Sequence, residues 1–139
     1  MSHHDQLFIE MAVRGCGILD FRYRVVQLNR MSWRAFLRQH NPAATALMVR
    51  MMIPRADRPK VKAQIMRLVS TMRLTLEKMG LIIAFVERYL ALTAKEMVAF
   101  EREMSDILGV KERRIVMELM TSWERKGRQE GRQEGRQEG

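Results

Sequence analysis

The chain of 139 residues contains little cysteine, proline and aromatic side chain, and no long apolar run. Its single cysteine, Cys16, excludes an internal disulfide framework and favours a reducing compartment, so we expect a cytoplasmic protein. The longest apolar stretch, 79–86, is far shorter than the roughly 20 residues of a membrane-spanning helix. The opening MSHHDQLF lacks the basic start and apolar run of a signal peptide. We therefore expect no membrane partner.

Acidic residues are scarce in one part of the chain. Residues 14–62 hold eleven Lys or Arg against two Asp, a net charge of +9 that equals the net charge of the whole protein. A basic segment of this kind is the electrostatic footprint that nucleic-acid binding requires. Arg also outnumbers Lys by nineteen to six, which a GC-rich genome would produce without any such function. Composition therefore leaves DNA open as a partner.

Residues that carry chemistry are equally few. The histidines are His3, His4 and His40, and no sequence neighbour completes a metal site around them. Cys16 has no base placed beside it, and no glycine-rich phosphate loop is present. The only Glu-x-Lys triplet, 124–126, falls at the end of an amphipathic helix, whereas a metal-dependent nuclease carries it on a core strand. We predict no catalytic residue, metal site, cofactor or small-molecule substrate.

The N-terminal region shows the alternation of β-strands. Residues 6–13 and 18–28 alternate with a period of two, and RGCG at 14–17 supplies the glycines of a tight turn. In the second run Leu19, Phe21, Tyr23 and Val25 share one face. We predict a β-hairpin with one buried face, because a two-stranded hairpin alone is marginal in water.

Helical signals follow the hairpin. Ser32 is a suitable N-cap for a helix that carries Trp33, Phe36 and Leu37 on one side. Asn41-Pro42 is a second start, for a helix through 43–52. The group 57–59 opens a third helix.

The third predicted helix carries a long apolar stripe from Val61 to Met79, after which Gly80 is expected to interrupt it. The segment 81–92 is apolar around most of its circumference, which indicates a central, buried helix. Thr93-Ala-Lys-Glu96 is a capping box for the next helix. A final amphipathic helix contains Trp123.

The predicted fold is therefore mainly α. It comprises an N-terminal β-hairpin (1–30), a small bundle of five or six helices (31–126) and a flexible GRQE repeat tail (127–139). The stripe helix, the 81–92 helix and the 93–108 helix should form the core.

The tail GRQEGRQEGRQEG repeats every four residues. On a helix its glycines form one column, its arginines another and its glutamates a third. Within the repeat, Arg and Glu never stand three or four positions apart, so they form no intrahelical ion pair. Each glycine also costs about 1 kcal/mol relative to alanine. We expect a disordered tail or a frayed helical extension, and we expect residues 1–126 to stay helical without it. The alternative is a zipper between chains.

The residues also carry a family resemblance. FRYRVVQLNRMSWRAFLRQHNPAATALMVRM, PRADRPKVKAQIMRLVSTMRL and VMELMTSWERKGRQEG together resemble the C-terminal region of the Rpn family. These recombination-promoting nucleases, or putative transposases, belong to the PD-(D/E)XK superfamily. The similarity covers roughly residues 18–139. It implies a magnesium-dependent nuclease core before this region, and no position here matches the catalytic motifs of that core.

The resemblance implies that the hairpin is the last part of a nuclease core whose catalytic part is missing. We expect a non-catalytic interaction or oligomerisation module, whose partner is a second copy or a full-length Rpn-type nuclease. The first alternative is a nucleic-acid-binding remnant in which the phosphate contacts are Arg22, Arg24, Arg30, Arg34 and Arg38. The second alternative is a truncated, non-functional gene product.

Overall fold

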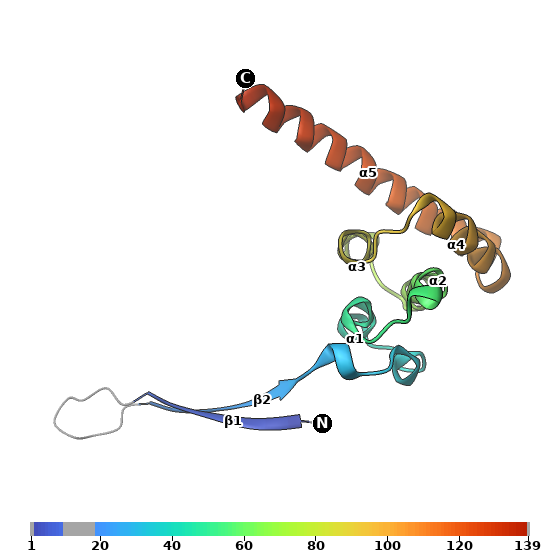
Figure 1. Cartoon of the computed structure of the whole chain (residues 1–139). Helices are drawn as coiled ribbons and strands as arrows, with labels where there is room; N and C mark the ends of the chain where they lie inside the picture. Colours follow the sequence, from blue (N-terminus) through green and yellow to red (C-terminus); the bar gives the residue numbers. More distant parts are fainter. Residues whose placement is uncertain (1, 10–18, 139) are drawn as a thin grey trace.

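The computed structural model describes residues 2–9 and 19–138, and it has three parts (Figure 1). A hairpin of two strands extends from one side of a helical body, and one long helix runs past the body on another side. The body is built from α1 (Pro42–Leu47), α2 (Arg58–Thr71), α3 (Leu76–Tyr89) and α4 (Ala94–Ile107), and the long helix is α5 (Val110–Glu138). The prediction of a mainly helical chain that begins with a hairpin is confirmed.

The hairpin pairs β1 (Ser2–Ile9) with β2 (Leu19–Val26) in antiparallel register. The register joins Ser2 to Val26 at the open end and Ile9 to Leu19 next to the connection. β1 begins four residues before the predicted strand, at Ser2 and not at Gln6. The predicted RGCG turn at 14–17 lies outside the described residues.

Within residues 19–138, four short 3-10 helices connect the larger elements. They are η1 (Leu28–Arg30), η2 (Trp33–Phe36), η3 (Met48–Arg50) and η4 (Arg55–Asp57). The predicted helix after Ser32 is thus a single 3-10 turn, and the Ser32 side chain makes no capping hydrogen bond. Asn41 does cap α1, since its Oδ1 accepts from the backbone N–H groups of Ala43 and Ala44 at 3.0 and 3.2 Å.

The centre of the body is α2, which contacts all the other α-helices. The residues of α2 that are completely buried are Val61, Ala63, Ile65, Met66, Leu68 and Val69. The prediction that 81–92 is the central helix is wrong, because Leu81 is 67% exposed. The outer side of that segment is apolar, and no element in the described part of the chain covers Leu81 or Tyr89.

The boundary between α2 and α3 also differs from the prediction. The apolar stripe continues in the sequence to Met79, but α2 ends at Thr71 and the chain turns before Thr75. Thr75 Oγ1 then accepts from the N–H of Lys78 at 3.3 Å and caps α3. Gly80 lies inside α3 and does not interrupt a helix.

The N-terminus of α4 confirms the predicted capping box. The hydroxyl of Thr93 accepts from the N–H of Glu96 at 3.2 Å, and the Glu96 carboxylate accepts from the N–H of Thr93 at 3.1 Å. Both bonds satisfy donors that the helix itself leaves unpaired. α4 then contributes Phe100 and Met104 to the core.

Methionine supplies a large share of the core. The buried methionines are Met48, Met51, Met66, Met72, Met79, Met104 and Met120. Methionine is unbranched and polarizable, so it fills irregular gaps between helices that cross at different angles.

The last helix continues through the repeat. α5 has 29 residues, which at 1.5 Å per residue makes it about 43 Å long. Val116 and Met120 anchor its first half in the core, whereas every side chain from Glu124 to Gln137 is exposed. Of the two expected states of the tail, disordered chain or helical extension, the structure has the extension. Lys126 and Glu130 form an ion pair at 3.9 Å where the repeat begins.

Candidate interaction site

The five arginines predicted to bind nucleic acid fall into two groups. Arg22 and Arg24 are exposed on β2, and Arg22 lies 3.7 Å from the Asp20 carboxylate. Arg30, Arg34 and Arg38 are exposed on the connection between the hairpin and α1. The first group therefore belongs to the hairpin that extends away from the helices, and the second to the segment that leads into them (Figure 1).

Arg34 already has partners within the chain. Its guanidinium donates to Asp57 Oδ2 at 3.3 Å, and its Cζ lies 4.5 Å from the centre of the Trp33 ring. The contact with Asp57 holds η2 against η4, and Asp57 partly neutralises the charge of Arg34. Sequence alone did not suggest this pair, because 23 residues separate the two partners.

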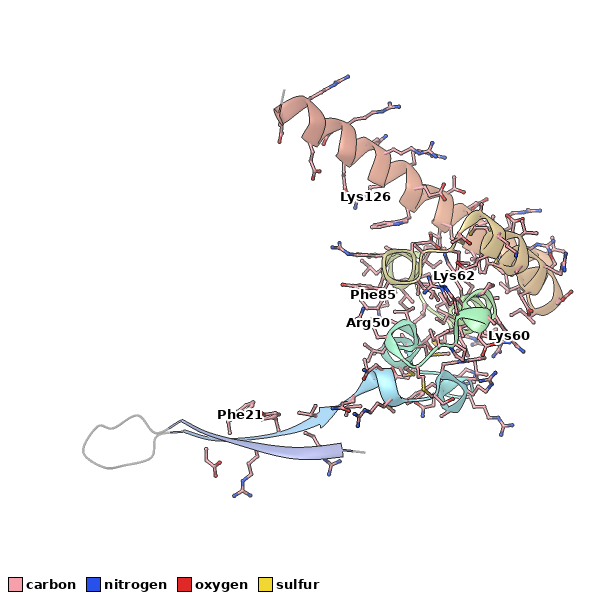
Figure 2. The ribbon with its side chains drawn as sticks, viewed as in Figure 1. Phe21, Arg50, Lys60, Lys62, Phe85 and Lys126 are labelled. Atoms are coloured by element: carbon pink, nitrogen blue, oxygen red, sulfur yellow. The ribbon has the colours of Figure 1, made fainter. Side chains whose placement is uncertain are left out.

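The face of the hairpin opposite Arg22 and Arg24 is apolar and exposed. The Phe21 and Tyr23 rings lie 5.9 Å apart between their centres and are 52% and 38% exposed. Figure 2 shows Phe21 on the extended hairpin, away from the helices. The prediction that this face is buried is wrong for the described side chains, because the hairpin leaves the body without a surface beneath it.

A charged pair lies inside the body. Lys62 on α2 is 1% exposed, and its Nζ lies 2.7 Å from Oε1 of Glu87 on α3. The same Nζ lies 5.3 Å from the centre of the Phe100 ring on α4. Three helices therefore meet at one buried cation (Figure 2). No bulk solvent or substrate reaches this ammonium group, so we assign it a structural role.

A second polar cluster joins the start of α2 to the start of α4. The Arg58 guanidinium donates to Glu96 Oε2 at 3.3 Å and to the Ala91 carbonyl at 2.7 Å. The backbone N–H of Thr93 donates to the Glu96 carboxylate and, with Arg58, lowers the pKa of Glu96 from its ordinary value of 4.5. The hollow of about 430 Å³ beside this cluster is also lined by Arg55. Arg58 and Glu96 pair with each other, which favours a structural role for this cluster.

Potential metal ligands do not gather at one place in the described residues. Residues 2–9 and 19–138 contain no group of three or more His, Cys, Asp or Glu side chains arranged to hold a metal ion. Cys16 lies outside the described ranges, and His40 is exposed before α1. Within the part of the chain that the structure describes, no helix combines the length and the hydropathy needed to cross a bilayer.

The freely projecting half of α5 is the most distinctive surface. Its repeat places Gly131 between Glu130 and Arg132, and each step along a helix turns by about 100°. The arginines and the glutamates therefore flank the glycine column on opposite sides. The side chains from Glu124 to Gln137 face solvent, and no other described element lies beside them (Figure 1). The sequence pattern revealed the columns, but not that they project beyond the body.

Comparisons with protein-family models, with curated proteins and with solved structures gave no match.

Proposed function

We propose that this protein is a non-catalytic oligomerisation module, in which the projecting half of α5 pairs with the same segment of a second copy. The observation that carries this proposal is the continuous helix from Val110 to Glu138, whose last fifteen residues extend about 22 Å past the body. An isolated helix with a glycine at every fourth position is unfavourable in water. Contact with a second helix supplies the missing stabilisation.

The charge columns favour a parallel pair. In a parallel pair, the two-fold axis runs along the helices between them. On each flank of the contact, opposite sides of the two helices therefore meet. The arginine column then meets the partner's glutamate column on both flanks. In an antiparallel pair each column would meet its own equivalent, and like charges would face each other. Charges that flank a helix contact set its orientation in this way in coiled coils.

The glycine column supports the same contact. Gly127, Gly131 and Gly135 have nothing within 4 Å of an added Cβ, so no element among the described residues uses their small size. A column of small residues spaced by four lets two helix backbones approach closely. The interface is short and polar, and standard interfaces bury about 1,200–2,000 Å². We therefore expect a concentration-dependent dimer.

The experiment is a set of column exchanges followed by analytical ultracentrifugation. Replacement of Arg128, Arg132 and Arg136 by Glu should leave the protein monomeric, because glutamates then face glutamates. A second variant with Arg at Glu130, Glu134 and Glu138 should also be monomeric, and the two variants should form a mixed dimer. Ala at Gln129, Gln133 and Gln137 is the matched control, since that column lies away from the contact.

Deletion of residues 127–139 tests the same proposal from the other side. The truncated protein should keep the helical circular dichroism of its body and lose the dimer. A dimer that survives the deletion, or a monomeric wild type at every concentration, would overturn the pairing.

The family relation is part of this proposal. The resemblance to the C-terminal region of Rpn-type nucleases makes a full-length relative the natural second partner, and the exposed Phe21 and Tyr23 face supports a docked hairpin. Size-exclusion chromatography of the protein with a full-length homologue tests this, and the absence of co-elution at micromolar concentration would count against it. The cytoplasm, favoured by the single cysteine, is the proposed compartment.

Nucleic-acid binding is the second candidate. It is supported by Arg24, Arg30 and Arg38, which are exposed and make no ion pair with a described residue. For duplex DNA the slope of log affinity against log salt should be about −0.9 per neutralised phosphate. An affinity that does not change with salt would remove this candidate.

A further inference from the structure

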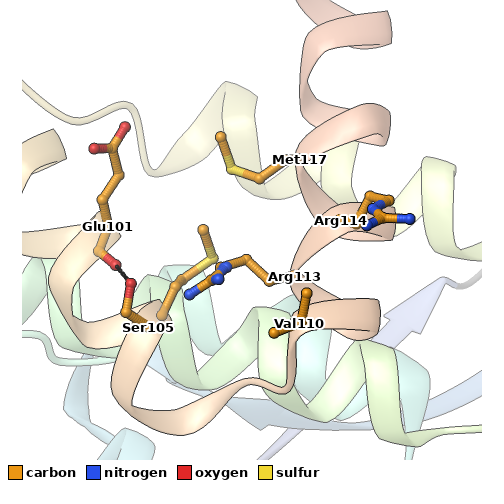
Figure 3. A pocket seen from close by; sticks show the side chains of 7 residues that line it. Glu101, Ser105, Val110, Arg113, Arg114 and Met117 are labelled. Atoms are coloured by element: carbon orange, nitrogen blue, oxygen red, sulfur yellow. Dashed lines mark hydrogen bonds between the residues drawn. The ribbon is translucent and has the colours of Figure 1, made fainter.

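The first half of α5 packs one side against the core. A groove runs along its other side, which faces solvent. Two adjoining hollows form it, of about 370 Å³ and 470 Å³, and Arg114 and Met117 line both. Figure 3 shows the first hollow between α4, which contributes Glu101 and Ser105, and the start of α5, which contributes Val110. The second hollow continues to Arg125 and is lined by residues of α5 alone. Together they follow about 22 Å of helix, or four turns.

The floor of the groove is apolar and adaptable. Met104 of α4 and Met117 of α5 line the first hollow, and Val110 at its end is 67% exposed. Thioether side chains change shape at low cost, which is why methionine is common on surfaces that accept a helix. Val110 offers apolar area that nothing in the described chain covers.

The rim of the groove is basic. Arg113, Arg114 and Arg125 line the hollows, and none of them forms a salt bridge within the described ranges. The hydroxyls nearby are already satisfied, because those of Ser105 and Thr121 donate to backbone carbonyls of their own helices. The guanidinium groups are therefore the donors available to a ligand.

We infer that this groove binds an acidic amphipathic helix of a partner protein. An apolar ridge of that helix lies on Met117 and Val110, over the buried Met104, while carboxylates beside the ridge reach the three arginines. This inference does not depend on pairing of the GRQE repeat, which uses residues beyond the groove.

Two observations favour a helix over a nucleic acid. No aromatic side chain lines either hollow, so a base has nothing to stack on. Glu101 and Glu118 also lie on the rim, where a helix can present lysine to them but a phosphate backbone has no cation to offer. The same two carboxylates would accept a lysine of the partner helix and so fix its register.

The experiment measures fluorescence anisotropy with two designed helical peptides and the full chain. Both peptides carry leucine at helical spacing, and the remaining positions are mainly Glu in one and mainly Lys in the other. The Glu peptide should bind the protein, and the Lys peptide should bind at least about tenfold more weakly.

Variants locate the binding in the groove. Arg114→Glu and Val110→Glu should each weaken the Glu peptide about tenfold, and both positions are exposed, so the fold should persist. Arg102→Glu is the matched control, because Arg102 is exposed on α4 outside the hollows and should bind the peptide as the wild type does. Arg114→Glu should in addition bind the Lys peptide more tightly than the wild type does.

Three results would overturn the inference. The first is equal binding of the two peptides, and the second is an equal loss in Arg102→Glu and Arg114→Glu. The third is displacement of the Glu peptide by a single-stranded oligonucleotide whose own binding is lost in Arg114→Glu, which would assign the groove to nucleic acid.

Discussion

Replacing Lys62 by methionine should destabilise the protein, although methionine is the commoner choice for this core. Lys62 and Glu87 form a pair at 2.7 Å, with side chains that are 1% and 14% exposed. Removing one partner of a buried pair costs about 3–5 kcal/mol, because the other charge stays buried without compensation. Glu87 keeps some access to water, so Lys62→Met should fall near the lower value, about 3 kcal/mol.

The reverse change should cost more. Glu87→Met leaves the ammonium of Lys62 without a counter-charge, in a site that water does not reach. The double variant Lys62→Met, Glu87→Met removes both charges and leaves methylene groups beside Phe100. Apolar replacement of a whole buried pair is often neutral, or stabilising by about 1–4 kcal/mol. The expected order of stability is the double variant at or above the wild type, then Lys62→Met, then Glu87→Met.

Thermal unfolding followed by circular dichroism measures this order. For a chain of this size, 1 kcal/mol corresponds to about 3–4 °C, so Lys62→Met should lower Tm by about 10 °C. Lys60→Met is the matched control, since Lys60 is exposed on the same helix and should leave Tm nearly unchanged. A double variant as unstable as Lys62→Met would refute the argument, because the cost would then lie in packing and not in the unpaired charge.

Two further predictions concern α3 and α4. Gly80→Ala should stabilise the protein by about 0.5–1 kcal/mol, as measured by urea unfolding, because Gly80 lies inside α3. An added Cβ would lie 3.9 Å from Leu119 Cδ2, which is an ordinary contact. A loss of stability would mean that α3 and α5 cannot admit a methyl group between them. The lowered pKa of Glu96 means that its contribution is complete above the unfolded value of 4.5 and is lost as the pH falls through the lower folded pKa. The wild type should therefore exceed Glu96→Gln in stability at neutral pH and approach it in acid, and a difference that does not change with pH would contradict the assignment.

Local signals in the sequence predicted local structure well. The Thr93–Glu96 box and the Asn41 cap form as expected, because each involves residues within three positions and depends on no other part of the fold. The strand alternation around Phe21 likewise predicts β2. These features need only the neighbouring backbone to be satisfied.

Long-range arrangement was less predictable. The outward stripe of α3, with Leu81 and Tyr89, resembles a buried helix because periodicity cannot tell whether a neighbour covers an apolar face. Lysine is usually a surface residue, and the burial of Lys62 depends on Glu87 from another helix. The same limit applies to the candidate site. In the sequence Arg34 resembles an unpaired, phosphate-binding arginine, and only the fold brings Asp57 to it.

The methionine-rich core has a chemical consequence. A thioether is oxidised to a sulfoxide only where peroxide can reach it, and the product is polar. Met52 is 54% exposed and open to attack in the folded protein, whereas Met48 and Met66 have no exposed surface. Met48 and Met66 can be oxidised only after the body opens. Their polar sulfoxides then oppose the return to the packed state. In the presence of peroxide, each rare opening of the body therefore leads to a lasting loss of the packed state.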